Sequence, residues 1–305
     1  MVQSIILTGP TAVGKSSLAV DLAEALGLEI INADSVCFYE EFNIGSAKPS
    51  IEDLKRVPHH LINIASPHEI YHAGKFLKDC DRALSDIHAR GKRALIVGGS
   101  GFYLKALRMG LWEAPATSPA FRKEVETVST EALFEELSLI DPTHALKVGS
   151  EDRYRLVRGL EIYRLSGKKP SELEAMMPDH PKPEFSLWVV DREKTELDRR
   201  MHSRVEQMIE AGLVNETQRL REKYPEAKTL NAVGYAQVIQ FMEGTVPPGR
   251  KLKRGINGLI DEIELAHRQL AKQQRTWFKN LKANESFTLD QDLNDLKEKL
   301  MNFYQ

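Results

Sequence analysis

Short apolar runs alternate with amphipathic stretches over the first hundred residues, and one more run comes later in the chain. The runs are rich in β-branched residues and end at turn-forming residues, which is typical of strands buried on both faces. They predict strands at residues 4–8, 29–33, 60–64, 93–97 and 185–190. Helical spacing of apolar residues between them predicts helices at 15–26 and 73–90. The alternation indicates a parallel sheet covered by helices on both sides.

From residue 112 to residue 184 the apolar positions follow helical spacing, without a strand pattern. Prolines gather near both ends of this stretch. We therefore expect a helical insertion domain at 112–184, within a core made of 1–111 and 185–305. Helices over 195–280 are expected to follow the last predicted strand.

A phosphate-binding motif lies between the first predicted strand and helix. The sequence GPTAVGKS fits the P-loop pattern GxxxxGK[ST], and its glycines let backbone N–H groups converge on a phosphate. Lys15 would neutralise phosphate oxygens, and the Ser16 hydroxyl would ligate Mg²⁺. The expected phosphate-binding residues are Gly9, Pro10, Thr11, Ala12, Val13, Gly14, Lys15 and Ser16. The expected fold class is α/β, a P-loop NTPase-like parallel sheet core with a helical insertion domain.

Two more loops follow predicted strands and should reach the same edge of the sheet, because parallel strands end together. Asp34 lies in the first loop, where it can act as a general base, as an outer-sphere partner of Mg²⁺ or as a turn cap. The second loop, GGSGFY at 98–103, lacks the Walker B carboxylate of ATPases. Its Ser100 either faces the crevice or caps the next helix. The missing carboxylate argues against NTP hydrolysis.

Two arginines in a later predicted helix suit a phosphate ligand. Arg200 and Arg204 lie four residues apart and so share one helical face. If this face meets the P-loop, either guanidinium can clamp a diphosphate with paired hydrogen bonds. Exposure to solvent is the alternative for each.

The overall charge excludes a uniformly basic surface, but its distribution favours a nucleic-acid partner. The 305 residues hold 42 Lys and Arg against 44 Asp and Glu, a net charge of −2. Residues 147–169 carry seven basic and three acidic residues, residues 250–282 carry nine and three, and the tail 283–305 is net acidic. Within the second stretch, basic residues recur at helical spacing at Arg268, Lys272, Arg275 and Lys279. Such a face suits a phosphate backbone, although a solvated helix face has the same pattern.

Cys37 and Cys80 are the only cysteines, so the chain has neither a disulfide framework nor a zinc-ligand pattern. It begins without a basic, apolar leader, and no apolar run reaches the roughly 18 residues of a membrane span. We expect a soluble, cytoplasmic protein without membrane contact.

Eight stretches of the chain match, in order, the motifs of one enzyme family. They are GPTAVGKSSLA at 9–19, NADS at 32–35, Tyr39 with NIGSAKPS at 43–50, VPHHLINI at 57–64, ARGKRALIVGGSGFYLKAL at 89–107, DRYRLVRGLEIYRLSGK at 152–168, NAVGY at 231–235 and QLAKQQRTWFK at 269–279. On these residues the chain resembles the tRNA dimethylallyltransferases, in the bacterial form without a C-terminal zinc finger. The succession covers nearly the full length and is very specific.

The resemblance implies that the P-loop holds dimethylallyl diphosphate and not ATP. The dimethylallyl group would move to the N6 amine of the adenosine 3′-adjacent to the tRNA anticodon. Asp34 matches the family's general base, and Ser100, where the family usually has Thr, would orient the amine or Asp34. Lys15, Ser16 with Mg²⁺ and Arg200 would take up charge that develops on the diphosphate. The expected catalytic residues are Asp34, Ser100, Lys15 and Arg200.

The resemblance also implies a surface for tRNA. The target base must leave its stack to reach the crevice, and the helical insertion would hold the anticodon stem-loop. The expected tRNA-binding residues are Asp34, Ser35, Val36, Cys37, Ser100, Arg122, Tyr154, Arg155, Leu156, Val157, Arg158, Leu230, Asn231, Ala232, Val233, Gly234, Tyr235, Lys272 and Arg275. The protein is expected to be a monomer.

Three residues depart from the family pattern. Cys37 stands where the family often has a Gln that can hydrogen-bond the flipped base, and a thiol fills this role poorly. Base selection is therefore expected to depend more on backbone groups. Ser46 and Ser100 replace Thr, which keeps the hydroxyl and removes a methyl contact.

Three other functions fit part of the pattern. A small-molecule P-loop kinase, with Asp34 binding the acceptor, would consume ATP but has no use for the basic stretches or the insertion. An isopentenyltransferase that acts on free adenine nucleotide is a closer variant. A P-loop RNA-binding module would not need Asp34.

Overall fold

The computed structural model divides the chain into two compact units, Met1–Arg108 with Lys182–Gln305, and Met109–Pro181. The expected insertion, 112–184, begins and ends three residues later than the second unit. The structure describes residues 3–178, 180–245 and 255–304.

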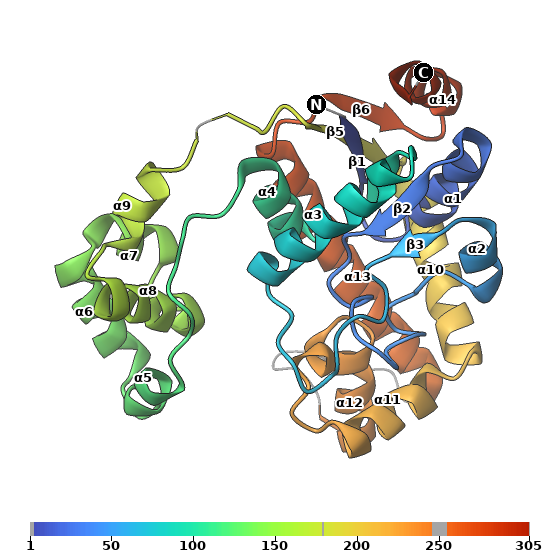
Figure 1. Ribbon diagram of the computed structural model, residues 1–305. Helices are drawn as coiled ribbons and strands as arrows, with labels where there is room; N and C mark the ends of the chain where they lie inside the picture. The colour runs from blue at the N-terminus through green and yellow to red at the C-terminus, as the bar shows by residue number, and fades with distance from the viewer. Residues whose placement is uncertain (1–2, 179, 246–254, 305) are drawn as a thin grey trace. The chain divides into compact units, whose positions relative to one another are not determined.

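A six-stranded sheet forms the centre of the first unit (Figure 1). Its strands are β1 (Ser4–Thr8), β2 (Glu29–Asn32), β3 (His59–His60), β4 (Ala94–Val97), β5 (Phe185–Asp191) and β6 (Glu285–Thr288). Their order is β3-β2-β4-β1-β5-β6, and all neighbours are parallel. The predicted strands at 4–8, 29–33, 93–97 and 185–190 are confirmed to within one residue.

The predicted strand at 60–64 is wrong beyond its first residue. Leu61 and Asn63 adopt the left-handed conformation, with φ of 61° and 53°, and this backbone cannot continue a strand. The side-chain amide of Asn32 instead donates to the carbonyl of Leu61 at 2.9 Å. The segment is therefore a turn that is fastened to the end of β2.

Helices surround the sheet. Those of the first unit are α1 (Lys15–Leu26), α2 (Ile51–Arg56), α3 (Ala73–Ala89), α4 (Gly101–Met109), α10 (Lys194–Glu210), α11 (Leu213–Lys223), α12 (Tyr235–Glu243), α13 (Gly255–Asn280) and α14 (Leu293–Tyr304). A 3₁₀ turn at Lys228–Asn231 lies between α11 and α12. The predicted helices at 15–26 and 73–90 are confirmed, the second ending one residue earlier. None of the described helices is both long and apolar enough to cross a membrane.

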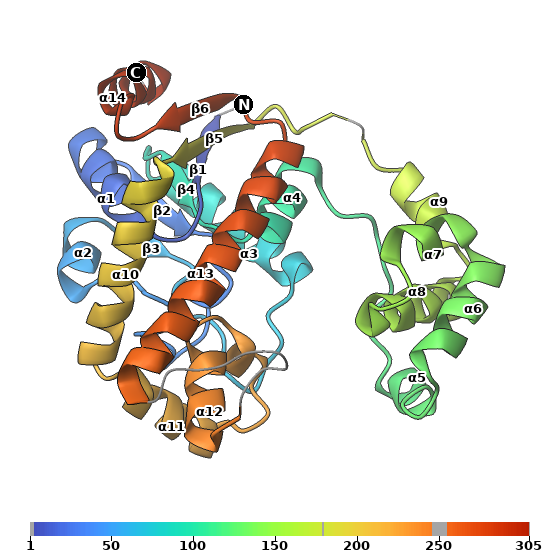
Figure 2. The ribbon, with the colours of Figure 1, turned by 180° about the vertical axis from the view of Figure 1, so that it is seen from behind.

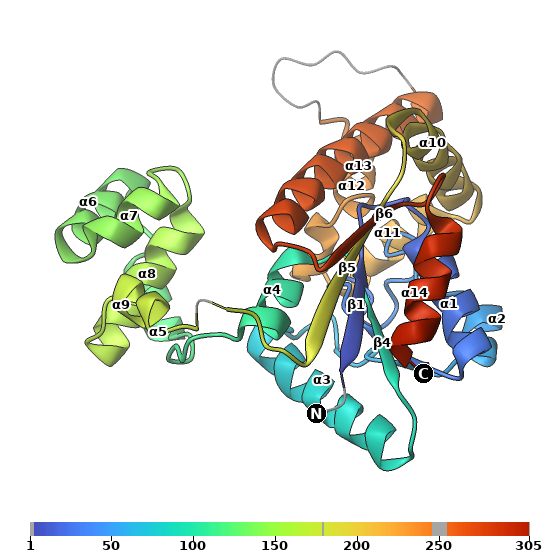
Figure 3. The same ribbon diagram turned by 90° about the horizontal axis from the view of Figure 1, so that it is seen from above.

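The apolar run of β1 contributes to the hydrophobic cores on both faces of the sheet. Helices α1 and α14 lie on one side of the sheet, and α3 and α4 lie on the other (Figure 3). Ile5 and Leu7 of β1 belong to the core that includes residues of α1 and α14, whereas Ile6 belongs to the core that includes residues of α3 and α4. This follows because successive residues of a strand face opposite sides. The long helix α13 runs beside α10 (Figure 2). It contributes Phe278 to one core and Ala271 to the other, and so borders both.

The acidic tail folds onto the sheet, which its charge did not predict. Strand β6 pairs with β5, and Leu296 and Leu300 of α14 are fully buried. The hydroxyl of Tyr304 donates to the carbonyl of Ala94 at 2.6 Å and accepts from the N–H of Ile5 at 3.1 Å. Apolar and aromatic positions, rather than net charge, determine the place of this segment.

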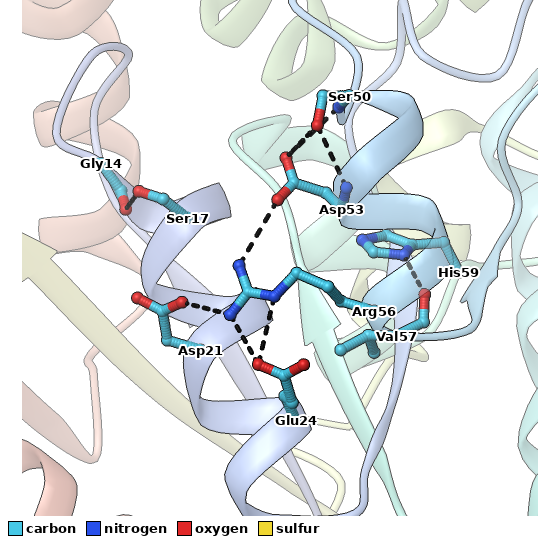
Figure 4. A network of polar contacts seen from close by, with 9 residues as sticks. All are labelled: Gly14, Ser17, Asp21, Glu24, Ser50, Asp53, Arg56, Val57 and His59. Atoms are coloured by element: carbon cyan, nitrogen blue, oxygen red, sulfur yellow. Dashed lines mark hydrogen bonds and ion pairs between the residues drawn. The ribbon is translucent and has the colours of Figure 1, made fainter.

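An ion-pair network joins α1 to α2 (Figure 4). Arg56 contacts Asp21 at 2.8 Å and Glu24 at 2.6 Å, both on α1, and Asp53 of its own helix at 3.7 Å. Ser50 and Asp53 form a capping box at the start of α2. Exposed ion pairs are individually weak, so we infer that the network orients this short helix rather than holding the fold together.

The second unit has a core of its own. Its described helices are α5 (Pro119–Glu124), α6 (Thr130–Ile140), α7 (Pro142–Val148), α8 (Arg153–Ser166) and α9 (Pro170–Ala175). Ser118, Ser129, Asp141 and Asp152 accept hydrogen bonds from backbone N–H groups at the starts of four of these helices. Leu133, Leu137 and Leu156 are fully buried between them.

Candidate active site

The loops that follow β1, β2 and β4 line one pocket of about 500 Å³. This volume lies in the range of small-molecule sites. Lys15, Asp34 and Ser100 each line the pocket, although they follow three different strands. The strand order β2-β4-β1 explains this, because neighbouring parallel strands end at one edge of the sheet.

The P-loop leaves backbone donors for a ligand. Helix α1 begins after Gly14, whose φ of 95° favours glycine, and no side chain caps the helix. The N–H groups of its first turn therefore have no partner within the helix. These donors, together with the positive end of the helix dipole, make an anion site.

Two arginines hold the backbone of the P-loop. Arg200 donates from Nε to the carbonyl of Ala12 at 3.0 Å, and Arg192 donates from Nε to the carbonyl of Val13 at 2.8 Å. A Cβ on Gly14 would lie 2.9 Å from Nη2 of Arg200. Burial, and then the charge of Arg192, lower the pKa of Arg200. Arg200 thus lies against the P-loop, and its role as a diphosphate clamp stays a prediction.

Two cations and one carboxylate interact in the pocket. Burial lowers the pKa of Lys15, and the charge of Asp34 opposes this shift. Burial also lowers the pKa of Arg204, again against the attraction of Asp34. The sequence left open whether Arg204 faces the P-loop or the solvent, and the structure places it in the lining of the pocket. The excess of positive charge favours an anionic ligand.

Asp34 is held in place by a turn. Its Oδ1 accepts from the N–H of Val36 at 3.2 Å, and its own N–H donates to Oδ1 of Asn32 at 3.0 Å. Among the described residues, the hydrogen bonds of this turn occupy one carboxylate oxygen and leave the other to a ligand. The capping role and the role of a base are therefore compatible.

Ser100 positions the neighbour of Asp34. Its hydroxyl accepts from the N–H of Ser35 at 2.9 Å and donates to the Ser35 hydroxyl at 3.1 Å. Gly98 permits this approach, because a Cβ there would lie 2.2 Å from the carbonyl oxygen of Ala33. The loop after β4 therefore supports the loop that carries Asp34.

Gln274 of α13 connects the P-loop to the loop after β4, a role that the sequence did not reveal. Its Oε1 accepts from the N–H of Thr11 at 2.8 Å, and its Nε2 donates to the carbonyl of Gly99 at 3.0 Å. Gln274 and His267, which also lines the pocket, occupy positions in the buried stripe of α13. Polar residues in an otherwise apolar stripe are the signal that could have identified both.

The expected tRNA-binding segment 230–235 divides into two groups. Asn231, Ala232 and Val233 line the pocket, whereas Leu230 and Tyr235 are 5% and 0% exposed. Gly234 is buried as well. The side chains of Leu230 and Tyr235 cannot reach a tRNA in this structure, because they belong to the core.

Tyr235 supports the pocket from behind. Its hydroxyl donates to Oε1 of Glu216 at 2.7 Å, and Glu216 also accepts from the N–H groups of Ile44 at 2.9 Å and Gly45 at 3.2 Å. A Cβ on Gly45 would lie 2.5 Å from the Tyr235 ring. Tyr235 and Glu216 together therefore hold the loop of Gly45 and Ser46, which lines the pocket.

Cys37 lines the pocket as a neutral thiol. Its Sγ donates to the carbonyl of Ser46 at 3.7 Å. Burial raises the pKa of the thiol to about 12. Ser35 and Val36 line the same wall.

The basic face of α13 is partly neutralised by acids. Arg275 donates to both carboxylate oxygens of Asp191 at 2.7 Å, and Nη2 of Arg268 lies 2.7 Å from Glu264. Lys272 is exposed. Four of the nine basic residues that defined this stretch, in 250–254, lie outside the described residues.

In the second unit a buried carboxylate organises several expected tRNA-binding residues. Glu161 is 0% exposed and accepts from Arg158 at 2.6 Å and from Arg122 at 3.2 Å. The guanidinium of Arg122 also lies 5.6 Å from the centre of the exposed Tyr154 ring. Arg155 is exposed and Val157 is half-buried, but Leu156 belongs to the core, so its side chain is not available to tRNA.

The residues around the P-loop fit a magnesium ion that is carried by a phosphate ligand. The described residues contain no group of three or more His, Cys, Asp or Glu side chains that could hold a metal ion. Mg²⁺ usually keeps several waters and binds through substrate phosphates. The exposed hydroxyl of Ser16, on the first turn of α1, suits this mode.

The chain matches the model of the IPP transferase family over residues 37–281. It is 40% identical to tRNA dimethylallyltransferase 1 of Citrifermentans bemidjiense, over 91% of this chain and 89% of that protein. The chain belongs to the IPP transferase family. A second relative, tRNA dimethylallyltransferase of Thermotoga petrophila, is 36% identical over 97% of this chain and 95% of its own.

Solved structures of IPP transferases have the same fold. A tRNA Δ2-isopentenylpyrophosphate transferase from Staphylococcus epidermidis superposes with a TM-score of 0.69 at 28% identity, over 99% of this chain and 98% of that one. A eukaryotic dimethylallyltransferase acting on tRNA gives 0.83 at 26% identity, over 98% of this chain and 78% of that one. The family resemblance and the α/β, P-loop NTPase-like fold class are confirmed.

Proposed function

We propose that this protein is an enzyme that transfers the dimethylallyl group of dimethylallyl diphosphate to N6 of the adenosine 3′-adjacent to the anticodon of tRNA. The observation that carries the proposal is a single pocket in which P-loop Lys15 lies near Asp34. The names of its relatives, which are tRNA dimethylallyltransferases, support the choice of substrates.

The P-loop binds the diphosphate. The uncapped N–H groups at the start of α1, with Lys15 and Arg204, face its oxygens. Arg200, bonded to the carbonyl of Ala12, adds positive charge beside the loop. Ser16 would hold Mg²⁺ together with the diphosphate, and the ion would supply further positive charge there. These groups stabilise the charge that grows on the leaving group.

Asp34 acts on the adenine. The N6 nitrogen forms a bond to C1 of the dimethylallyl group, and the C1–O bond breaks with its electron pair leaving on the diphosphate. The carboxylate of Asp34 takes the N6 proton as the new bond forms. Ser100 contributes by holding Ser35, so that the loop of Asp34 keeps its position.

The helical unit and the exposed cations hold the tRNA. Arg122, Tyr154, Arg155, Val157 and Arg158 on the second unit, with Lys272 on α13, are the candidates for contacts with phosphates and bases. Asn231, Ala232 and Val233 take part from the wall of the pocket. We place the enzyme in the cytoplasm as a monomer within the same proposal.

One assay tests the proposed function against its alternatives. Purified protein is given Mg²⁺ and labelled dimethylallyl diphosphate with either unmodified tRNA or AMP, and ATP consumption is followed separately. Label in tRNA is the expected result. Label in AMP alone would favour an isopentenyltransferase of free nucleotides, and ATP consumption without prenyl transfer would favour a kinase. tRNA binding without either reaction would leave the RNA-binding module.

A further inference from the structure

His267 of α13 is a buried histidine without a hydrogen-bond partner. Only 4% of its surface is exposed, and neither ring nitrogen is bonded to any of the residues that the structure describes. The residue lines the same pocket as Lys15 and Asp34. Buried polar groups are nearly always hydrogen-bonded, so an unpartnered ring in a ligand pocket indicates a partner that arrives with the ligand.

Arg204 of α10 is the charged group that acts on this ring. Burial, and then the positive charge of Arg204, lower the pKa of His267 to about 3, so the ring is neutral before a ligand binds. The Nε of Arg204 is itself buried without a partner among the described residues. The two unsatisfied groups therefore belong to one part of the pocket.

Three carboxylates on α13 and on the helices beside it, Glu264, Glu216 and Glu243, are engaged with other partners. On α13 itself, Glu264 contacts His202 and Arg268, so it does not compensate His267. On the neighbouring α12, the hydroxyl of Tyr235 donates to Glu216, and Glu243 pairs with Arg221.

The remaining titratable groups of the pocket come from four other places. They are Lys15 on α1, Asp34 and Cys37 after β2, His59 on β3 and Tyr103 on α4. Asp34 attracts both Lys15 and Arg204, and burial keeps the Cys37 thiol neutral by raising its pKa to about 12. Burial also raises the pKa of Tyr103 and lowers that of His59, so neither adds a compensating charge at neutral pH. Two cations, Lys15 and Arg204, against the one carboxylate of Asp34 therefore leave the site of His267 with an excess of positive charge until an anion enters.

We propose that His267 is a further residue of the diphosphate site. Its ring takes up a proton when the diphosphate binds and then, beside Arg204, donates a hydrogen bond to a diphosphate oxygen. The inference rests on the proposed function, because it assumes a diphosphate ligand. The proton comes from solvent and stays on the ring nitrogen. During transfer the hydrogen bond strengthens as the electron pair of the C1–O bond moves onto the diphosphate.

Proton-linked binding of inorganic diphosphate tests the inference without tRNA. The full chain is titrated with diphosphate and Mg²⁺ at pH 7 by calorimetry, in two buffers that differ in ionisation enthalpy. The wild type is expected to take up more protons than His267→Gln, by up to one per site. Its affinity should exceed that of the variant by about ten- to a hundredfold, the scale of a hydrogen bond to a charged group.

Two further variants separate binding from folding. His267→Leu removes the unpartnered polar atoms, so its thermal unfolding midpoint should equal or exceed that of the wild type while diphosphate affinity still falls. His88→Gln, on α3 and outside the pocket, is the matched control and should bind diphosphate as the wild type does.

The outcomes are distinct for the two proposals. Equal proton uptake and equal diphosphate affinity in wild type, His267→Gln and His267→Leu overturn the inference. A rise in the KM for tRNA with unchanged diphosphate affinity also overturns it, because His267 would then serve the base. If the wild type binds diphosphate but transfers no dimethylallyl group to tRNA, the proposed function fails and the assignment of His267 to a diphosphate site stands.

Discussion

The side-chain oxygen of Gln274 accepts a hydrogen bond from the backbone N–H of Thr11 at 2.8 Å. Because the Nε2 of the same residue donates to Gly99, one side chain of α13 sets the distance between the P-loop and the loop after β4. The fit is close, since a Cβ on Gly99 would lie 2.6 Å from Nε2 of Gln274. Gln274 is therefore a positioning residue of the pocket.

Replacing Gln274 by Leu should weaken binding of dimethylallyl diphosphate. The N–H of Thr11 and the carbonyl of Gly99 would lose their partner, at a cost of about 1–3 kcal/mol for each buried group. We expect the KM for dimethylallyl diphosphate to rise at least about tenfold, with a smaller change in kcat. Steady-state kinetics measure this, with the exposed Gln269→Leu as control. A folded variant with an unchanged KM would show that the P-loop holds its shape without Gln274.

Replacing Asp34 by Asn should remove the base and keep the turn. The Asn oxygen can still accept from the N–H of Val36, but it cannot take a proton from N6. We expect kcat to fall by about two to four orders of magnitude with tRNA affinity nearly unchanged. Single-turnover transfer and filter binding measure the two quantities. Loss of tRNA affinity with normal turnover at saturation would assign Asp34 to binding.

Replacing Tyr235 by Phe tests whether this residue is structural. The change removes a buried hydrogen bond to Glu216, so the free energy of unfolding should fall by about 1–3 kcal/mol. The tRNA affinity of the folded variant should stay that of the wild type, because the side chain is fully buried. Chemical denaturation and tRNA titration provide the two measurements. Weaker tRNA binding at unchanged stability would instead support the predicted contact between Tyr235 and tRNA.

Two cations on one face of α13 should behave differently. Lys272→Ala is expected to weaken tRNA binding a few-fold and to reduce the slope of log affinity against log salt by about 1, as for the loss of one phosphate contact. Arg275→Ala should mainly lower the unfolding temperature, because Asp191 loses its bidentate partner. Salt titrations and thermal melts separate the effects. If Arg275→Ala instead weakens tRNA binding and reduces the salt slope, the ion pair of Arg275 with Asp191 must break when tRNA binds.

His267 should make the protein more sensitive to acid. Its pKa is about 3 when folded and about 6.5 when unfolded, so the unfolded chain binds the proton more readily as the pH falls below about 6.5. The contribution is constant above that pH and destabilises the fold by about 2 kcal/mol at pH 5. His267→Leu should lose this part of the acid sensitivity, as denaturation at pH 7 and pH 5 would reveal. Parallel losses of stability in both proteins would contradict the burial of a neutral ring.

The sequence determined those features that depend on neighbouring residues. The four confirmed strands, the first helix and the P-loop each follow from a local pattern, because burial on two faces and a glycine turn are visible within a few positions of the sequence. The order of the motifs along the chain was also sufficient to identify the family. Lys15, Asp34 and Ser100 could be placed at one edge, since parallel strands end together.

The tertiary structure alone decided which polar residues complete the site and which become core. Gln274 contacts Thr11, which lies 263 positions away in the sequence. The lowered pKa of His267 depends in part on the charge of Arg204, which lies on another helix. The motifs predicted that Tyr235 and Arg275 contact tRNA. In the folded chain Tyr235 donates a hydrogen bond to Glu216, and Arg275 donates to Asp191. Burial and pairing depend on contacts between distant segments, and a pattern read along the chain contains no record of those contacts.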